Sequence, residues 1–315
     1  MKLARVLLKA RPTPSQLTDR LAPPWPGGLE LYLDRADVVT EDECKAVIGR
    51  IKERELPPGF AFVVEGPLRG LDNEFFDLSI CNDATKEMIR RLGWMAQEIG
   101  ADGVVMHCIM PRFSLEDNVW ERRDEIFATC MEFVQFYVDT LVSMGVTPTL
   151  ENVPPVLRMR ESRYLFTPVG MAPEDVRWFL DHAPGLQATL DISHGQLYVN
   201  ARAMAERGEG DAEVQPLMRY LQNFPLISSV EAFVDVLEPS IFEAHVSNAS
   251  GLLGEGARYD DGDIDMNRVI GRLARTARYL VTETIEPDND KADLMREAQQ
   301  GMESVIERIS EQHED

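Results

Sequence analysis

Cysteine is scarce in this chain, which has four cysteines in 315 residues and no C-x-x-C pair. Cysteines scattered in this way argue against a disulfide framework and a zinc finger, and they are typical of proteins in a reducing cytosol. Long apolar runs are also lacking. No segment approaches the roughly 20 apolar residues of a membrane span, and the first apolar stretch is too short for a signal peptide. The sequence therefore predicts a soluble, cytoplasmic protein that does not enter a membrane.

Positive charge is also in short supply, because 32 Lys and Arg face 54 Asp and Glu and leave a net charge of −22. A surface of this sign repels phosphate backbones, so nucleic acid is not expected as a partner. No G-x-G-x-x-G motif follows the first apolar run, Arg5-Val-Leu-Leu8. Its absence weighs against an open dinucleotide-binding sheet without excluding one.

The chain does have a regular alternation of short apolar runs with helical patterns. Strict alternation of this kind predicts a parallel sheet. Strands each followed by a helix fit a single (β/α)8 TIM barrel, which we expect to span residues 1–315. The predicted strands are residues 5–8, 29–33, 60–64, 103–107, 147–151, 187–191, 242–246 and 279–282.

Two of the predicted helices have informative sequences. Thr40 and Glu43 form a capping box that opens a helix running to about residue 56. A longer amphipathic helix is predicted over residues 119–144, and its aromatic side chains cannot all face the sheet at a period of 3.6 residues. These side chains are Phe127, Phe133, Phe136 and Tyr137. We therefore predict that this helix meets a second subunit of a homo-oligomer.

Acidic and histidine side chains gather at the ends of the predicted strands. Four of them end such strands: Glu151, Asp191, His245 and Glu283. The carboxyl ends of parallel strands share one mouth, where several carboxylates repel one another unless a cation or a proton holds them. Taken singly, such a glutamate often caps a helix and such a histidine often packs in the core. The coincidence favours a metal site, because three of the five histidines (His107, His194 and His245) lie at or just past strand ends.

The expected ligands are carboxylates and imidazole, without thiolate. Ligands of this kind suit Mn²⁺, Mg²⁺, Co²⁺ or Zn²⁺, and the absence of thiolate removes the argument for a structural zinc. The sequence therefore predicts a divalent metal ion and metal-assisted chemistry at the mouth of the barrel.

Four short motifs resemble, in order, those of the xylose isomerase-like barrel superfamily, and the resemblance covers most of the chain. They are Leu-Glu151-Asn, Leu-Asp191-x-x-His194, Ala-His245-Val-Ser-Asn and Val-Thr-Glu283. The superfamily includes sugar isomerases, ketose 3-epimerases, hydroxypyruvate isomerase, inosose dehydratase and the endonuclease IV class. The motifs are short, so they indicate the superfamily more specifically than any branch within it.

The resemblance to the ketose epimerase branch implies roles for particular residues. Glu151, Asp191, His245 and Glu283 match the four metal ligands of that branch, and His194 matches a histidine that contacts a substrate hydroxyl. Arg258 lies in the loop after the seventh strand, where the branch has an arginine that binds a substrate oxygen. The loop departs from the pattern because it lacks the usual Pro-Gly.

In that branch the reaction is proton transfer on a small sugar or keto-polyol through an enediolate. The resemblance implies that Glu151 and Glu283 face each other across the metal ion and exchange protons with the substrate. The sequence thus predicts a metal-dependent isomerase or epimerase. A dehydratase remains an alternative, because elimination of water begins with the same proton abstraction.

Two further alternatives fit the sequence less well. The endonuclease branch places a histidine after the third strand, where this chain has Glu65, and an Asp-x-His pair after the seventh strand, which this chain lacks. A non-catalytic metabolite-binding barrel would tolerate loss of at least one ligand, yet all four are present. Residues on the loops after strands are candidates for contacts with the substrate, although each of them could equally serve only to pack its loop. They are Glu65, His107, Arg112, Trp120, Arg158, Tyr164 and Tyr259.

Overall fold

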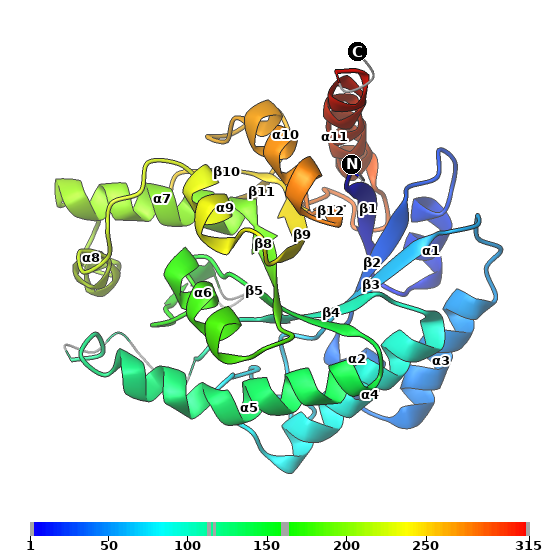
Figure 1. Cartoon of the computed structure of the whole chain (residues 1–315), viewed down its shortest axis with the longest axis horizontal. Coiled ribbons are helices and arrows are strands. Elements are labelled where there is room, and N and C mark those ends of the chain that lie inside the picture. Colours follow the sequence, from blue (N-terminus) through cyan, green and yellow to red (C-terminus); the bar gives the residue numbers. More distant parts are fainter. Residues whose placement is uncertain (1–2, 112–114, 116–117, 159–163, 313–315) are drawn as a thin grey trace.

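The computed structural model describes residues 3–111, 115, 118–158 and 164–312 of the chain. Within these residues, eight parallel strands close into a barrel in the order β1-β12-β9-β8-β5-β4-β3-β2. Barrel strands that follow one another in the sequence are thus neighbours in space, and helices surround them (Figure 1). The predicted (β/α)8 barrel is confirmed, and the alternative of an open doubly wound sheet is wrong.

Every segment predicted as a strand lies in the barrel. The barrel strands are β1 Arg5–Ala10, β2 Gly28–Tyr32, β3 Ala61–Glu65, β4 Gly103–His107, β5 Thr147–Glu151, β8 Gln187–Asp191, β9 Ile241–Val246 and β12 Tyr279–Thr282. The main difference is at β1, which continues past Leu8 to Ala10 and so includes Lys9.

In the part of the chain that is described, two short antiparallel hairpins lie outside the barrel. One pairs β6 (Leu157–Arg158) with β7 (Tyr164–Leu165), and the other pairs β10 (Asn248–Ser250) with β11 (Gly254–Ala257). Both hairpins follow barrel strands, β5 and β9, so they belong to the face on which the strand ends open.

The helices of the described residues follow the predicted alternation. They are α1 Pro14–Arg20, α2 Arg35–Val38, α3 Glu41–Lys52, α4 Asp83–Ile99, α5 Arg123–Ser143, α6 Pro173–His182, α7 Ile192–Arg207, α8 Gln215–Leu221, α9 Glu231–Leu237, α10 Met266–Thr276 and α11 Asp293–Glu311. The predicted capping box opens α3: Glu43 N donates to Thr40 Oγ1 over 3.3 Å, and Thr40 N donates to Glu43 Oε2 over 3.0 Å. None of the described helices is long and apolar enough to cross a membrane.

The aromatic side chains of α5 find their partners within the chain. Phe127, Phe133 and Tyr137 are 4%, 0% and 1% exposed. Phe136 is half-buried and packs under the side chains of Lys86 and Arg90 from α4. Besides the sheet, α5 packs against α4 and the aromatic residues of α6, so its aromatic side chains are buried without a second subunit. The reason given for an interface on this helix is therefore removed.

The interior of the barrel has an apolar layer below an ionic one. Buried apolar side chains fill the lower layer: Leu7, Ala61, Val63, Val105, Phe242, Tyr279 and Val281. Side chains that point to the same face of a strand recur every second residue, so the next inward positions are Lys9, Glu65, His107 and Glu283. The ionic layer thus lies toward the carboxyl ends of the strands, which is where a barrel carries its functional sites.

Candidate metal centre

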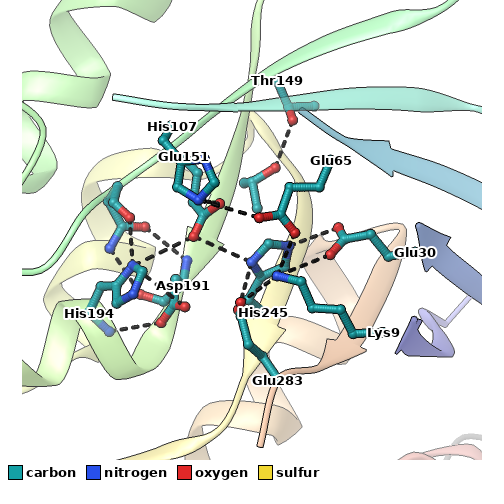
Figure 2. A network of polar contacts seen from close by, with 12 residues as sticks. Lys9, Glu30, Glu65, His107, Thr149, Glu151, Asp191, His194, His245 and Glu283 are labelled. Carbon is teal, nitrogen blue, oxygen red and sulfur yellow. Dashed lines mark hydrogen bonds and ion pairs between the residues drawn. The ribbon is translucent and has the colours of Figure 1, made fainter. Parts of the chain in front are cut away.

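The four predicted ligands meet at the carboxyl ends of β5, β8, β9 and β12 (Figure 2). Glu151, Asp191, His245 and Glu283 each offer one ligand atom, and these atoms all lie within 4.8 Å of one another. Asp191 pairs with His245 across the β8–β9 ladder, which brings two of them side by side. Glu151, Asp191 and His245 are buried, whereas the side chain of Glu283 is 27% exposed at the mouth.

Several ligand atoms of this cluster are buried without a hydrogen-bond partner among the described residues. They are both carboxylate oxygens of Glu151, Nδ1 of His245 and Oε2 of Glu283. His245 Nδ1 lies 2.8 Å from Glu283 Oε2 and 3.4 Å from Glu151 Oε1. Buried polar atoms left unpaired are costly, and lone pairs of oxygen and nitrogen converging on one point fit a divalent cation.

Glu30 holds the His245 ring from the opposite side. His245 Nε2 lies 2.8 Å from Glu30 Oε2, and because an ionised carboxylate can only accept, Nε2 carries the hydrogen. The other nitrogen, Nδ1, is thereby directed at the cluster. A carboxylate behind a histidine ligand is the usual support of a metal site, since it fixes the ring and raises its basicity.

Asn152, which directly follows β5, forms hydrogen bonds with the last residue of the neighbouring strand β8. Its side chain accepts from Asp191 N over 2.8 Å and donates to Asp191 O over 2.9 Å. Its main-chain oxygen accepts from His194 Nδ1 over 2.9 Å. His194 therefore has its Nδ1 hydrogen engaged and presents Nε2 toward Glu255 of β11, 3.9 Å away. Asn152 thus orients both Asp191 and His194.

The charges of the cluster shift its pKa values in opposite directions. Burial works to raise the pKa of Glu151, but His107 and His245 outweigh it and lower that pKa to about 2. Burial dominates at Asp191 and raises its pKa well above the ordinary value. Burial works to lower the pKa of His194, but Asp191, Glu255 and Glu151 raise it to about 9. In the absence of a metal ion, the cluster therefore balances its charge by holding protons.

Two residues in contact with the cluster, Lys9 and Glu30, were not predicted from the sequence. Lys9 contacts three carboxylates at once: it donates to Glu283 Oε1, and its Nζ lies 2.6 Å from Glu65 Oε2 and 3.4 Å from Glu30 Oε1. Burial works to lower the pKa of Lys9, but these carboxylates hold it well above its ordinary value. The sequence feature that could have indicated them is a charged residue in or next to an apolar strand. Glu30 stands in Leu-Glu-Leu, and Lys9 directly follows Leu8, where the first strand was predicted to end.

The predicted substrate contacts divide into two groups. Glu65 and His107 do lie in the mouth, where His107 Nε2 is 3.4 Å from Glu65 Oε1 and 3.5 Å from Glu151 Oε2. Arg258 is half-exposed and donates to Glu297 of α11 over 2.8 Å, so its side chain is held in a surface ion pair, and its contact with a substrate oxygen stays a prediction.

The other loop residues considered from the sequence do not enter the cluster in the part of the chain that is described. Trp120 packs on Tyr220 and Phe224, and the ring of Tyr259 lies against Gly301 of α11. Arg112 lies outside the described residues, as do the side chains of Arg158 and Tyr164.

No protein-family model and no curated protein matches this sequence. Solved structures do match the fold. A D-tagatose 3-epimerase-like protein aligns with a TM-score of 0.63 at 16% identity, over 97% of this chain and 99% of its own. A 3-keto-D-glucoside 4-epimerase from E. coli aligns with a TM-score of 0.58 at 15% identity, over 96% and 98%. An AP endonuclease of family 2 from Brucella melitensis aligns with a TM-score of 0.55 at 12% identity, over 94% and 99%.

These neighbours are xylose isomerase-like barrels, and this chain has their fold, as its motifs predicted. Several of the neighbours are sugar epimerases by name. At such low identity the likeness shows the fold alone, so the function has to be argued from the side chains of the site.

Proposed function

We propose that the protein is a divalent-metal-dependent isomerase or epimerase of a small sugar or keto-polyol. The observation that carries the proposal is the convergence of ligand atoms from four strand ends, several of them buried and unpaired, with Glu30 behind the histidine ligand. Two carboxylates beside such a centre suit proton transfer at a carbon next to a carbonyl group. The epimerases among the solved structures of this fold add support.

Glu151, Asp191, His245 and Glu283 would hold the metal ion, which in this kind of site stabilises negative charge developing on a carbonyl oxygen. Burial works to raise the pKa of Glu151, but His107 and His245 lower it to about 2, so its carboxylate is ionised at neutral pH. Removal of a proton beside the carbonyl leaves the substrate as an enediolate. His194 offers Nε2 to a substrate hydroxyl, because its Nδ1 is engaged by Asn152.

The experiment is a panel of aldoses, ketoses and keto-polyols, tested with the metal-stripped protein and again after addition of Mn²⁺, Mg²⁺, Co²⁺ or Zn²⁺. Metal-dependent conversion of at least one member is expected. Glu151→Gln should lower its rate by about 10²–10⁴-fold, the usual contribution of a general acid–base group.

Glu297→Gln is the matched control, because Glu297 is a half-exposed glutamate paired with Arg258 on the surface. It should leave conversion unchanged. The proposal is refuted if the four-ligand cluster binds no divalent ion, or if the metal-loaded protein converts no member of the panel. Cleavage of abasic DNA by the same preparation would place the protein with the nucleases instead.

A further inference from the structure

Lys9 is a buried cation directly beside the candidate metal centre. It has no part in the reaction proposed above. Its side chain is 7% exposed and projects from β1 into the ionic layer of the barrel (Figure 2). An ammonium group has three N–H donors, and Glu283, Glu65 and Glu30 surround it. Lys9 thus donates a hydrogen bond to Glu283 and forms ion pairs with Glu65 and Glu30, so three carboxylates hold it inside the barrel.

The contact with Lys9 makes the two glutamates of the centre unequal. Glu283 Oε1 accepts a hydrogen bond from Lys9, and Glu283 Oε2 lies 2.8 Å from His245 Nδ1, at the ligand cluster. One oxygen of Glu283 is thus committed to an ammonium group, and the other faces the ligand cluster. A carboxylate held in this way is a good ligand and a poor proton acceptor.

Glu151 is in the opposite situation. Neither of its oxygens has a hydrogen-bond partner among the described residues. Its nearest charged neighbours are His245 Nδ1 at 3.4 Å, with His107 Nε2 and His194 Nδ1 at 3.5 Å. One oxygen of Glu151 can serve as a ligand while the other remains available to a proton.

We propose, on the basis of the sugar chemistry proposed above, that Lys9 fixes Glu283 as a ligand and leaves Glu151 as the one acid–base carboxylate of the centre. Lys9 acts through Glu283 and is a positioning residue. With a single carboxylate to move the proton, the reaction is a shift of hydrogen between neighbouring carbons on one face of the substrate. The protein is then an aldose–ketose type of isomerase and not an epimerase.

The steps balance without a further reactant. Glu151 removes a proton from the hydroxyl-bearing carbon next to the carbonyl, the C–H electrons form the C=C bond, and the carbonyl π electrons move onto oxygen. The Glu151 carboxyl group returns the proton to the former carbonyl carbon on the same face. The hydroxyl proton of the first carbon moves to the oxygen of the second, which leaves a carbonyl group on the first carbon. Inversion at one carbon needs a donor on the opposite face, and Glu283 does not supply it.

The first test uses the wild-type protein and a panel substrate with deuterium on the hydroxyl-bearing carbon beside the carbonyl. We expect the carbonyl to move to that carbon, and part of the deuterium to be found on its neighbour, since one carboxyl group carries it across. Inversion at a single carbon as the main product, with hydrogen taken entirely from solvent, would overturn the inference and leave the proposed function standing.

The second test compares Lys9→Met and Lys9→Arg with the control Lys291→Met, whose side chain is 57% exposed. Lys9→Met frees Glu283 Oε1, so the ratio of inverted to shifted product should rise by about tenfold or more, while Lys9→Arg, which keeps the charge, should restore the wild-type ratio. An unchanged ratio in Lys9→Met would contradict the proposal.

A third measurement does not depend on activity. Calorimetric titration of the metal-stripped proteins with Mn²⁺ should show weaker binding by Lys9→Met, by about tenfold, because Glu283 is no longer held in place as a ligand, whereas Lys9→Arg should bind nearly as the wild type does. Lys291→Met should bind as the wild type does. Unchanged or tighter binding by Lys9→Met would contradict the proposed role of Lys9 in holding Glu283. If metal binds and no sugar is converted, the proposed function fails, and this titration alone decides whether Lys9 acts on Glu283.

Discussion

Glu30 on β2 and His245 on β9 are hydrogen-bonded over 2.8 Å, although they are 215 positions apart in the chain. The bond crosses the interior of the barrel and turns His245 Nδ1 toward Glu283 and Glu151. Neither residue of the pair is exposed to solvent. The orientation of a candidate metal ligand thus depends on a strand that contributes no ligand to the four-residue cluster.

We predict that Glu30→Gln lowers the affinity for a divalent metal ion by about 10–100-fold, the usual effect of losing the carboxylate behind a histidine ligand. Calorimetric titration with Mn²⁺ or Zn²⁺ measures it. Glu243→Gln is the matched control. Glu243 is buried on the same barrel, but its Oε1 accepts from Thr189 and its Oε2 has no hydrogen-bond partner among the described residues, so the substitution removes no bond to His245. Equal affinities of both variants and the wild type would contradict the prediction.

His194→Asn should raise KM and leave the metal in place. The ring of His194 is oriented by Asn152 O and presents Nε2 to the mouth, but it is not one of the four clustered ligands. Loss of one hydrogen bond to a substrate hydroxyl should raise KM by about tenfold. Metal content after dialysis, measured by atomic emission, should equal that of the wild type. A variant that has lost its metal would make His194 a ligand and refute the assignment.

Metal affinity should rise with pH. In the metal-free protein, burial works to lower the pKa of His245, but Glu30, Glu283 and Glu151 raise it well above its ordinary value. Burial raises the pKa of Asp191 as well. Below these pKa values a metal ion has to displace protons, so affinity should increase by about tenfold per pH unit for each proton released and level off above them. Titration calorimetry in buffers of different ionisation enthalpy counts the protons. A pH-independent affinity with no proton release would count against the ligand set.

Removing the carboxylate of Asp175 should destabilise the fold away from the metal centre. Asp175 is fully buried, pairs with Arg123 and accepts from Gly170 N over 2.8 Å. Asp175→Asn leaves the buried guanidinium group uncompensated, which should cost about 3–5 kcal/mol in the free energy of unfolding measured in urea. Asp181→Asn, at the exposed pair with Arg177, is the control and should unfold as the wild type does. Equal loss in both variants would show that burial is not the cause.

The sequence was sufficient for the barrel and for the four-residue cluster. Each barrel strand is a short apolar run, and apolar runs alternating with helical patterns have few ways to pack other than around a parallel sheet. The carboxyl ends of the strands in such a sheet lie on one face. The side chains of Glu151, Asp191, His245 and Glu283 could therefore be expected to lie close together before any contact between them was known.

Only the tertiary structure showed how Lys9 and Glu30 take part. Both stand within or just beyond apolar runs, and a charged residue there has no local feature that distinguishes burial from exposure. Their burial follows from the closing of the barrel, which places β1 next to β12 and brings Lys9 to Glu283, 274 positions away. The second subunit predicted on α5 was argued from a sheet alone, and the packing of α4 and α6 on that helix removed its basis. Local pattern determines which residues lie at a strand end, whereas the partner of a buried charge is decided by contacts between segments far apart in the chain.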